Sequence, residues 1–166
     1  MKIKLLIAAA FAATFPFLAH GETLQFPSEE PIAEVSIPQS WAPKETDTGV
    51  DATSPDSAIY LSIDIASDKT IEKTIDDAVD FLVKNDVEID AKSKHEFPDS
   101  VHNGMKMAHL EWDGKDKDGP VDVELGLFQA SEHKILVVTY WGSKDTQDKH
   151  DEAMQKIMDS LKPIND

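Results

Sequence analysis

The sequence predicts an α+β fold, an α/β/α sandwich in which an antiparallel sheet of about six to seven strands carries a helix on each face. Three segments predict it. The first, Lys134–Trp141, is apolar or aromatic at nearly every position, which is typical of a central strand covered on both faces. The other two, about Ile71–Lys84 and Thr146–Leu161, have apolar residues at helical spacing and can supply the two covers.

The N-terminus has the layout of a secretory signal peptide. Lys2 and Lys4 precede the apolar run Leu5–Leu18, and the small residues Ala19 and Gly21 bracket a cleavage point. This apolar run is too short to span a membrane readily as a helix, and no later apolar run is long enough. We therefore expect cleavage near Gly21 and a location in the periplasm or outside the cell.

Removing residues 1–21 leaves residues 22–166, which is 166 − 21 = 145 residues and enough for a single domain. The chain has no cysteine, so we expect no disulfide, no thiol nucleophile and no lipid anchor. We also expect no integral membrane segment in the mature chain.

The chain is strongly acidic, with 32 acidic residues against 16 basic ones, all of them lysine. Loss of Lys2 and Lys4 with the signal peptide leaves 14 lysines and a net charge of 14 − 32 = −18. Nucleic acid and anionic lipid are therefore poor partners, because both require a dense positive surface. The acidic surface can attract cations or a basic protein, or it can simply keep the protein in solution.

The first part of the chain alternates apolar and polar residues in three segments. Ile32–Ile37 reads as a strand, and Gly49–Thr53 and Ala58–Ile65 read as a hairpin around the turn Ser54–Ser57. The helix that follows has an apolar stripe of Ile71, Ile75, Ala78, Val79 and Leu82. A fourth strand is predicted over Val87–Phe97.

Asn103-Gly104 is the clearest turn signal, because both residues tolerate the positive φ angles of a tight hairpin. Centring the turn there places His102 opposite Met105 and Phe97 opposite Leu110. It also places Glu96 opposite Glu111, an unfavourable pair that a bulge at Pro98 can relieve.

A polar loop is predicted at Asp113–Gly119, followed by a strand at Val121–Phe128 and by the central strand. Together with the preceding hairpin, these form an antiparallel meander. The last helix is expected to bury Met154, Ile157, Met158 and Leu161 and to end before Pro163.

Asp113, Asp116 and Asp118 in this loop suggest a calcium site, since hard cations prefer clustered carboxylates. With Gly119 at the sixth position of a calcium-binding loop, however, Gly114 and Leu125 occupy positions that require carboxylates. We therefore favour a solvated hairpin loop over a calcium site.

His102 and His109 are weak candidates for a zinc or copper site, because the hairpin places them on one face. They lie about 13 Å apart along the ladder, too far to share one metal ion. A site there requires folding to bring His133 or His150 alongside. No cofactor is predicted.

No constellation of catalytic residues is evident. Ser143 lacks the Gly-x-Ser-x-Gly elbow of a nucleophile, and no glycine-rich phosphate loop or dinucleotide fingerprint is present. Among the aromatic residues, Trp112 and Tyr140 are assigned to the core. Trp41 follows a proline in a turn and is the weak candidate for an exposed partner-binding anchor.

Several details resemble the PsbP-like superfamily, which includes the photosystem II extrinsic protein, the nuclear Ran-release factor and exported bacterial proteins of the DcrB type. They are Ile37-Pro-x-x-Trp41, Ser54-Pro-Asp56 before an Ile-Tyr-Leu strand, Asn103-Gly-Met105 and Ser160-Leu-Lys-Pro163. The resemblance implies an α/β/α sandwich and action by binding rather than catalysis. It carries over no functional residue.

Three functional hypotheses follow. The first is an exported, non-enzymatic binding or accessory protein whose partner is an unknown protein or small ligand. The second is a periplasmic protein that binds a metal or a small ligand. The third is a hydrolase with an unrecognised pair of carboxylates.

Overall fold

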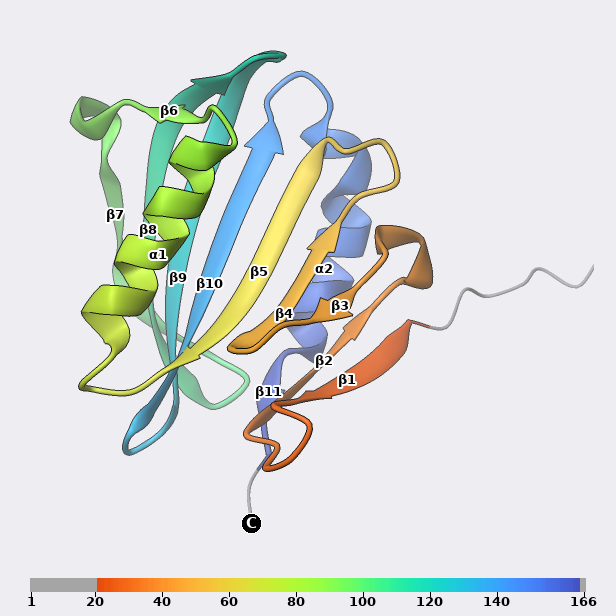
Figure 1. The fold of residues 1–166 in the computed structure, drawn as a ribbon, viewed down its shortest axis with the longest axis vertical. Coiled ribbons are helices and arrows are strands. Elements are labelled where there is room, and N and C mark those ends of the chain that lie inside the picture. Colours follow the sequence, from red (N-terminus) through yellow and green to blue (C-terminus); the bar gives the residue numbers. More distant parts are fainter. Residues whose placement is uncertain (1–20, 165–166) are drawn as a thin grey trace, which may run out of the picture.

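The computed structural model describes residues 21–164, so the predicted signal peptide lies outside the described residues except for Gly21. An eight-stranded antiparallel sheet has the order β3-β4-β5-β10-β9-β8-β6, with β7 also paired to β8, and a smaller sheet has the order β1-β2-β11 (Figure 1). The strands are β1 (Glu22–Phe26), β2 (Ala33–Ile37), β3 (Lys44–Glu45), β4 (Gly49–Thr53), β5 (Ile59–Ala66), β6 (Glu88–Ile89), β7 (His95–His102), β8 (Met105–Asp116), β9 (Gly119–Ser131), β10 (Lys134–Ser143) and β11 (Lys162–Pro163).

Strand β10 lies in the middle of the large sheet, between β5 and β9, as its apolar sequence predicted. Its successive residues Leu136, Val137 and Val138 are all buried. Leu136 and Val138 pack into the cluster on one face, and Val137 packs into a cluster on the other. The central strand is therefore covered on both sides.

The two covers are helices α1 (Ile71–Lys84) and α2 (Asp151–Ser160), which lie on opposite faces of the large sheet (Figure 1). A short 3-10 turn, Gln147–His150, precedes α2. This arrangement confirms the predicted helix on each face. Neither helix in residues 21–164 has the length and apolar character that crossing a bilayer requires.

The helix α1 is less buried than its stripe predicted. Of its residues, Leu82 alone is classed as buried, and Val79 is 43% exposed. In α2, by contrast, Ile157 is fully buried, and Leu161 directly after the helix is buried as well.

The small sheet was not predicted. Strand β2 was expected within a single sheet, but it pairs with β1 and β11 instead. Its inward residues Val35 and Ile37 pack into the same cluster as Ile157 of α2. The small sheet therefore extends the core on the α2 face.

The prediction of one strand over Val87–Phe97 is wrong, because β6 and β7 are separated by a 3-10 turn at Ala91–Ser93. The tight hairpin turn is confirmed: Asn103 and Gly104 have φ angles of 48° and 83°. His102 pairs with Met105 as predicted.

Further along this hairpin the predicted register fails. Phe97 pairs with His109 rather than with Leu110, because the pairing shifts between Phe97 and Ser100, a segment that contains Pro98. Glu96 thereby pairs with Leu110, and the unfavourable pair with Glu111 is avoided.

The predicted polar loop at Asp113–Gly119 is also wrong in extent. Strands β8 and β9 continue through it, and their pairing runs to Asp116 and Gly119. Only two residues, Lys117 and Asp118, separate the strands.

Candidate functional site

A cleft of about 470 Å³ lies between α2 and the large sheet. Its floor is apolar, formed by Leu61 of β5, Phe128 of β9 and Val138 of β10. Alternation along each strand directs these side chains to the α2 face. Met154 and Met158 of α2 form the opposing wall.

A polar pair stands at one end of the cleft. His109 Nε2 of β8 donates a hydrogen bond of 2.9 Å to Glu124 Oε2 of β9. The ring of Phe97 stacks on that of His109 with centroids 4.4 Å apart. Burial raises the pKa of Glu124 above its ordinary value, although His109 partly offsets the effect. The cleft therefore presents an imidazole fixed by a hydrogen bond and a stacked ring, together with a carboxylate that is costly to ionise.

A second polar chain adjoins this pair. The Tyr140 hydroxyl donates to Gln147 Oε1 at 2.8 Å, and Gln147 Nε2 donates to Asp122 Oδ2 at 2.5 Å. Burial, followed by the nearby carboxylates Glu124 and Asp122, raises the pKa of Tyr140, so its hydroxyl stays protonated at neutral pH. Gly142 makes room for this chain, since a Cβ there would lie 2.2 Å from the Tyr140 hydroxyl oxygen.

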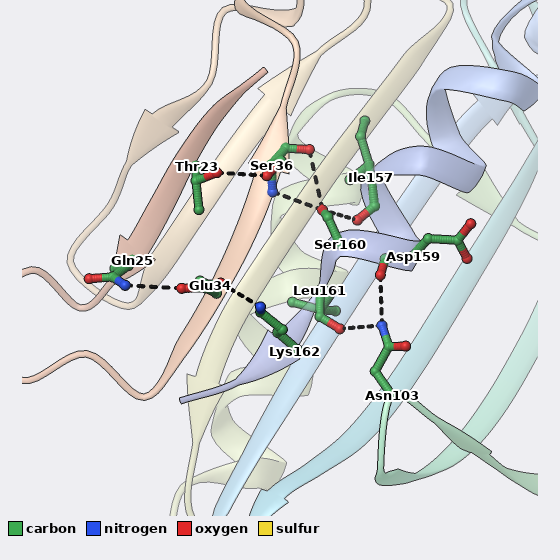
Figure 2. A network of polar contacts seen from close by, with 10 residues as sticks. All are labelled: Thr23, Gln25, Glu34, Ser36, Asn103, Ile157, Asp159, Ser160, Leu161 and Lys162. Carbon is green, nitrogen blue, oxygen red and sulfur yellow. Dashed lines mark hydrogen bonds and ion pairs between the residues drawn. The ribbon is translucent and has the colours of Figure 1, made fainter. Parts of the chain in front are cut away.

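The other end of the cleft is fixed to the last turn of α2. His102 Nε2 lies 2.7 Å from the Met158 carbonyl oxygen, and because a carbonyl can only accept, that nitrogen carries the proton. Asn103 Nδ2 donates to the carbonyl oxygens of Asp159 and Leu161, at 2.9 and 2.8 Å (Figure 2). The hairpin turn thus satisfies carbonyls that the end of a helix leaves open.

The serine that ends α2 ties the helix to the small sheet. Ser160 Oγ donates to the Ile157 carbonyl oxygen at 2.6 Å and accepts a hydrogen bond of 2.8 Å from the Ser36 backbone nitrogen (Figure 2). These bonds, together with those from Asn103, hold the wall of the cleft in place from two sides.

The lining of the cleft combines an apolar floor with a few polar groups. None of the described residues that line it is a serine, threonine or lysine, so Tyr140, with its raised pKa, is the sole hydroxyl among them. The floor can receive an apolar group, while Glu124 and Gln147 can bond to a polar one. This combination of an apolar lining with a few converging polar groups is typical of ligand sites.

The predicted metal candidates His102 and His109 both line this cleft. Each is already bonded through Nε2, one to the Met158 carbonyl and the other to Glu124. Within residues 21–164, no three His, Asp or Glu side chains are arranged to hold a metal ion. His133 and His150 lie elsewhere, paired with Asp68 and Asp56.

Asp113, Asp116 and Asp118 do not gather around a common point. Asp113 forms an ion pair with Lys144. Asp116 Oδ1 accepts from the backbone nitrogens of Asp118 and Gly119, at 2.8 and 3.0 Å. These bonds make the acidic segment part of a tight hairpin turn.

The expectation that Trp41 is exposed is wrong. Trp41 is 2% exposed and belongs to the core cluster on the α2 face. Its ring lies edge-on to that of His150 with centroids 5.6 Å apart. Ala42, which ends the 3-10 turn Gln39–Trp41 at a φ of 48°, turns the chain so that the indole points inward.

Sequence reasoning missed Glu124 and Gln147 as cleft residues, and Asp122 as the residue that accepts a hydrogen bond from Gln147. The signal was present in Val121–Phe128, where Asp122, Glu124 and Gly126 alternate with buried aliphatic residues. A polar set on one face of an inner strand indicates that this face borders a cavity rather than a packed core.

Neither a family model nor a curated protein matches the chain. Solved structures do. The cyanobacterial PsbP protein CyanoP of Synechocystis sp. PCC 6803 matches with a TM-score of 0.56 and 11% identity, covering 95% of this chain and 99% of that one. LpqN of Mycobacterium tuberculosis, described as involved in cell envelope biogenesis, matches with a TM-score of 0.54 and 10% identity, covering 87% of this chain and 90% of that one.

A protein of Bacteroides thetaiotaomicron matches with a TM-score of 0.57 and 9% identity over 89% of this chain. The matched region is 50% of that protein, so the chain spans about half its length. At such low identities these likenesses concern the fold alone. They confirm the prediction from sequence: the chain has a PsbP-like α+β fold.

Proposed function

We propose that the chain is an exported, non-enzymatic binding or accessory protein whose ligand enters the cleft under α2. The observation that carries the proposal is the cleft itself, about 470 Å³ with an apolar floor and the converging groups of His109, Glu124 and Gln147. A volume of this size suits a small ligand or one or two side chains of a partner protein. The same lining offers no activated nucleophile, which favours binding over catalysis.

Export is proposed from the N-terminal sequence. The first strand of the fold begins at Glu22, directly after the predicted cleavage point at Gly21. The signal peptide can therefore be removed without cutting into an element of the fold. Mass spectrometry of the protein recovered from a periplasmic fraction should give the mass of a chain that begins at Glu22. Recovery of the full-length chain from the cytoplasm would contradict export.

Ligand capture with a blocked cleft tests the binding role. Gln155 lies exposed on α2 at the border of the cleft, so Gln155→Trp should cover the opening without disturbing the core. Asp159→Trp places the same bulk on an exposed position of α2 that does not line the cleft. We expect wild type and Asp159→Trp to retain the same molecule from a periplasmic extract and Gln155→Trp to lose it.

Equal retention by all three proteins would exclude the cleft as the site. Turnover of a substrate that is lost in Glu124→Gln would overturn the non-enzymatic role and favour the carboxylate hydrolase instead.

A metal-binding role is the second candidate, because imidazoles and thioethers line the same cleft, from His102, His109, Met107, Met154 and Met158. Thioether and imidazole ligands favour copper. Calorimetric titration with copper and zinc tests this role. A heat of metal binding that is lost in the His109→Gln variant would support this role. The absence of any heat of binding with either metal would exclude it.

A further inference from the structure

The opposite face of the sheet contains a second space, beneath α1. One part is an apolar cavity of about 340 Å³, lined among others by Leu82 of α1 and Trp112 of β8. The other part is a polar cavity of about 250 Å³, lined by residues of β4, β5 and α1. Ala78 and Thr139 line both cavities, so the two adjoin under the middle of the helix.

Thr139 supplies an unusual feature at this junction. The residue is 2% exposed, and its Oγ1 has no hydrogen-bond partner among the described residues. A buried hydroxyl without a partner costs on the order of 1–3 kcal/mol, so native proteins seldom retain one. Thr139 lines both cavities, but its Oγ1 is closed to water, so a molecule that spans the junction provides the missing partner once a small shift of α1 uncovers the hydroxyl.

The polar cavity has the chemistry of an ammonium site. Asp51, Asp64 and Asp77 contribute carboxylates, and no lysine or histidine is among its described lining residues. The rings of Tyr60 and Phe81 stack at its side with centroids 4.7 Å apart. Carboxylates combined with aromatic faces attract organic cations through charge and cation–π interaction.

Two of these carboxylates differ in how they are held. Asp64 accepts hydrogen bonds from the hydroxyls of Thr48 and Ser62, at 2.6 and 3.1 Å. Burial raises the pKa of Asp51 above its ordinary value, an effect that nearby Lys44 only partly offsets. A bound cation would favour the ionised form of Asp51.

The apolar cavity suits a hydrocarbon chain. Its wall includes the side chains of Ile75, Val79 and Leu125 besides those of Leu82 and Trp112. A hydrocarbon chain of a few carbons placed there would bury apolar surface that α1 leaves uncovered, at a gain of about 0.8 kcal/mol per methylene group.

We propose that the space beneath α1 binds a small cationic amphiphile. Its ammonium head lies among Asp51, Asp64 and the Tyr60–Phe81 ring pair, its apolar chain fills the cavity beside Leu82, and it bonds to the Thr139 hydroxyl at the junction. This site lies across the sheet from the cleft under α2 and does not depend on the function proposed for that cleft.

Three probes with the same chain and different heads test the class of ligand. Octylamine, octanol and octanoate are titrated calorimetrically into the mature protein near neutral pH. We expect octylamine to bind roughly tenfold more tightly than octanol, because its charge meets the carboxylates of Asp51 and Asp64, and octanoate to show no binding. Binding of octanoate as tight as that of octylamine, or binding of none of the three, would overturn the proposal.

Variants locate the bound octylamine. Thr139→Val keeps the shape of the side chain and removes the hydroxyl, and we expect it to weaken octylamine binding roughly threefold to tenfold. Ala78→Leu fills the junction and should abolish binding. Asp51→Asn should weaken binding of octylamine but not of octanol.

The matched control is Gln155→Trp, which blocks the cleft under α2 and should leave octylamine binding unchanged. Loss of binding in Gln155→Trp together with full binding in Thr139→Val would place the amphiphile in the other cleft and refute this site. Since Thr139→Val removes only an unpartnered buried hydroxyl, we expect it to fold, so its result decides the question even if Ala78→Leu fails to fold.

Discussion

The two faces of the large sheet are built differently. On the α2 face, one continuous cluster joins both sheets and includes Phe128, Leu136 and Ile157. On the α1 face, buried residues form two separate small clusters, around Leu82 and around Val137. The α2 face therefore contributes most of the buried apolar surface that stabilises the fold, and the α1 face leaves space under its helix.

Polar contacts follow the same division. The end of α2 is bonded to the β7–β8 hairpin through Asn103 and to β2 through Ser160. Within residues 21–164, the side-chain hydrogen bonds of α1, such as Lys73 to Asp77 and Thr74 Oγ1 to the Thr70 carbonyl oxygen, stay within the helix and the turn before it. A helix attached mainly by partly buried apolar contacts can move more easily to admit a ligand.

The largest expected difference between the faces concerns stability. Ile157→Ala should lower the free energy of unfolding by about 3–4 kcal/mol, because it opens a cavity in the continuous core. Val79→Ala on α1 should cost less than about 1 kcal/mol, since Val79 is 43% exposed. Urea denaturation monitored by circular dichroism measures both, and equal losses would refute the asymmetry.

A smaller loss of stability is expected when the side-chain hydrogen bonds at the helix ends are removed. Asn103→Ala removes two hydrogen bonds to the end of α2 and strains a residue at a φ of 48°, so we expect a loss of about 2–3 kcal/mol. Asn103→Gly tolerates the φ angle and should recover about 1 kcal/mol of that loss. The matched control on the other face is Asn85→Ala, whose amide donates only to the Phe81 carbonyl oxygen of α1 at 2.8 Å.

Asn85→Ala should cost about 1 kcal/mol or less, because the end of α1 remains open to solvent. The comparison fails if Asn85→Ala destabilises the protein as much as Asn103→Ala does, since the two helix ends would then be held equally.

Local periodicity predicted the helices and the central strand, because each carries its own repeating pattern of apolar residues. The bounds Ile71–Lys84 match α1, and the Asn103-Gly104 turn was recognised from the conformations it requires. The separate small sheet was missed because the pairing of β2 with β1 and β11 depends on partners distant in sequence. No local pattern distinguishes such a strand from one in the main sheet.

The cleft was predicted only in part. His102 and His109 were chosen for their metal-binding chemistry, and both line it, but their bonding to Met158 and Glu124 follows from where α2 and β9 lie. Trp41 was expected to be exposed from its position after a turn, yet the core of two sheets extends over it. Which aromatic residue is covered depends on tertiary packing, which a turn signal does not reveal.

The smallest expected effect is on the pH dependence of stability, and its sign differs between the two faces. The Asp56 carboxylate, beside the start of α2, accepts hydrogen bonds from the Ser54 hydroxyl, the Ala58 backbone nitrogen and His150 Nε2, which lower its pKa to about 2. Its stabilising contribution is therefore present above its unfolded pKa of about 3.9 and is lost as the pH falls towards 2.

The Asp51 carboxylate under α1 responds in the opposite direction, because burial raises its pKa. Its stabilising contribution is present below its unfolded pKa and is lost as the pH rises through the higher folded value.

Thermal unfolding of Asp56→Asn and Asp51→Asn, followed from about pH 2 to pH 7, tests these signs. Relative to wild type, Asp56→Asn should be less stable near neutral pH and should lose this difference in acid, because protonation of wild-type Asp56 abolishes the same interactions. Asp51→Asn should gain stability relative to wild type as the pH rises, because it removes a carboxylate that is costly to ionise. The same sign of change in both variants would show that the two carboxylates experience similar surroundings, and the contrast between a tightly bonded α2 face and a more open α1 face would then be wrong.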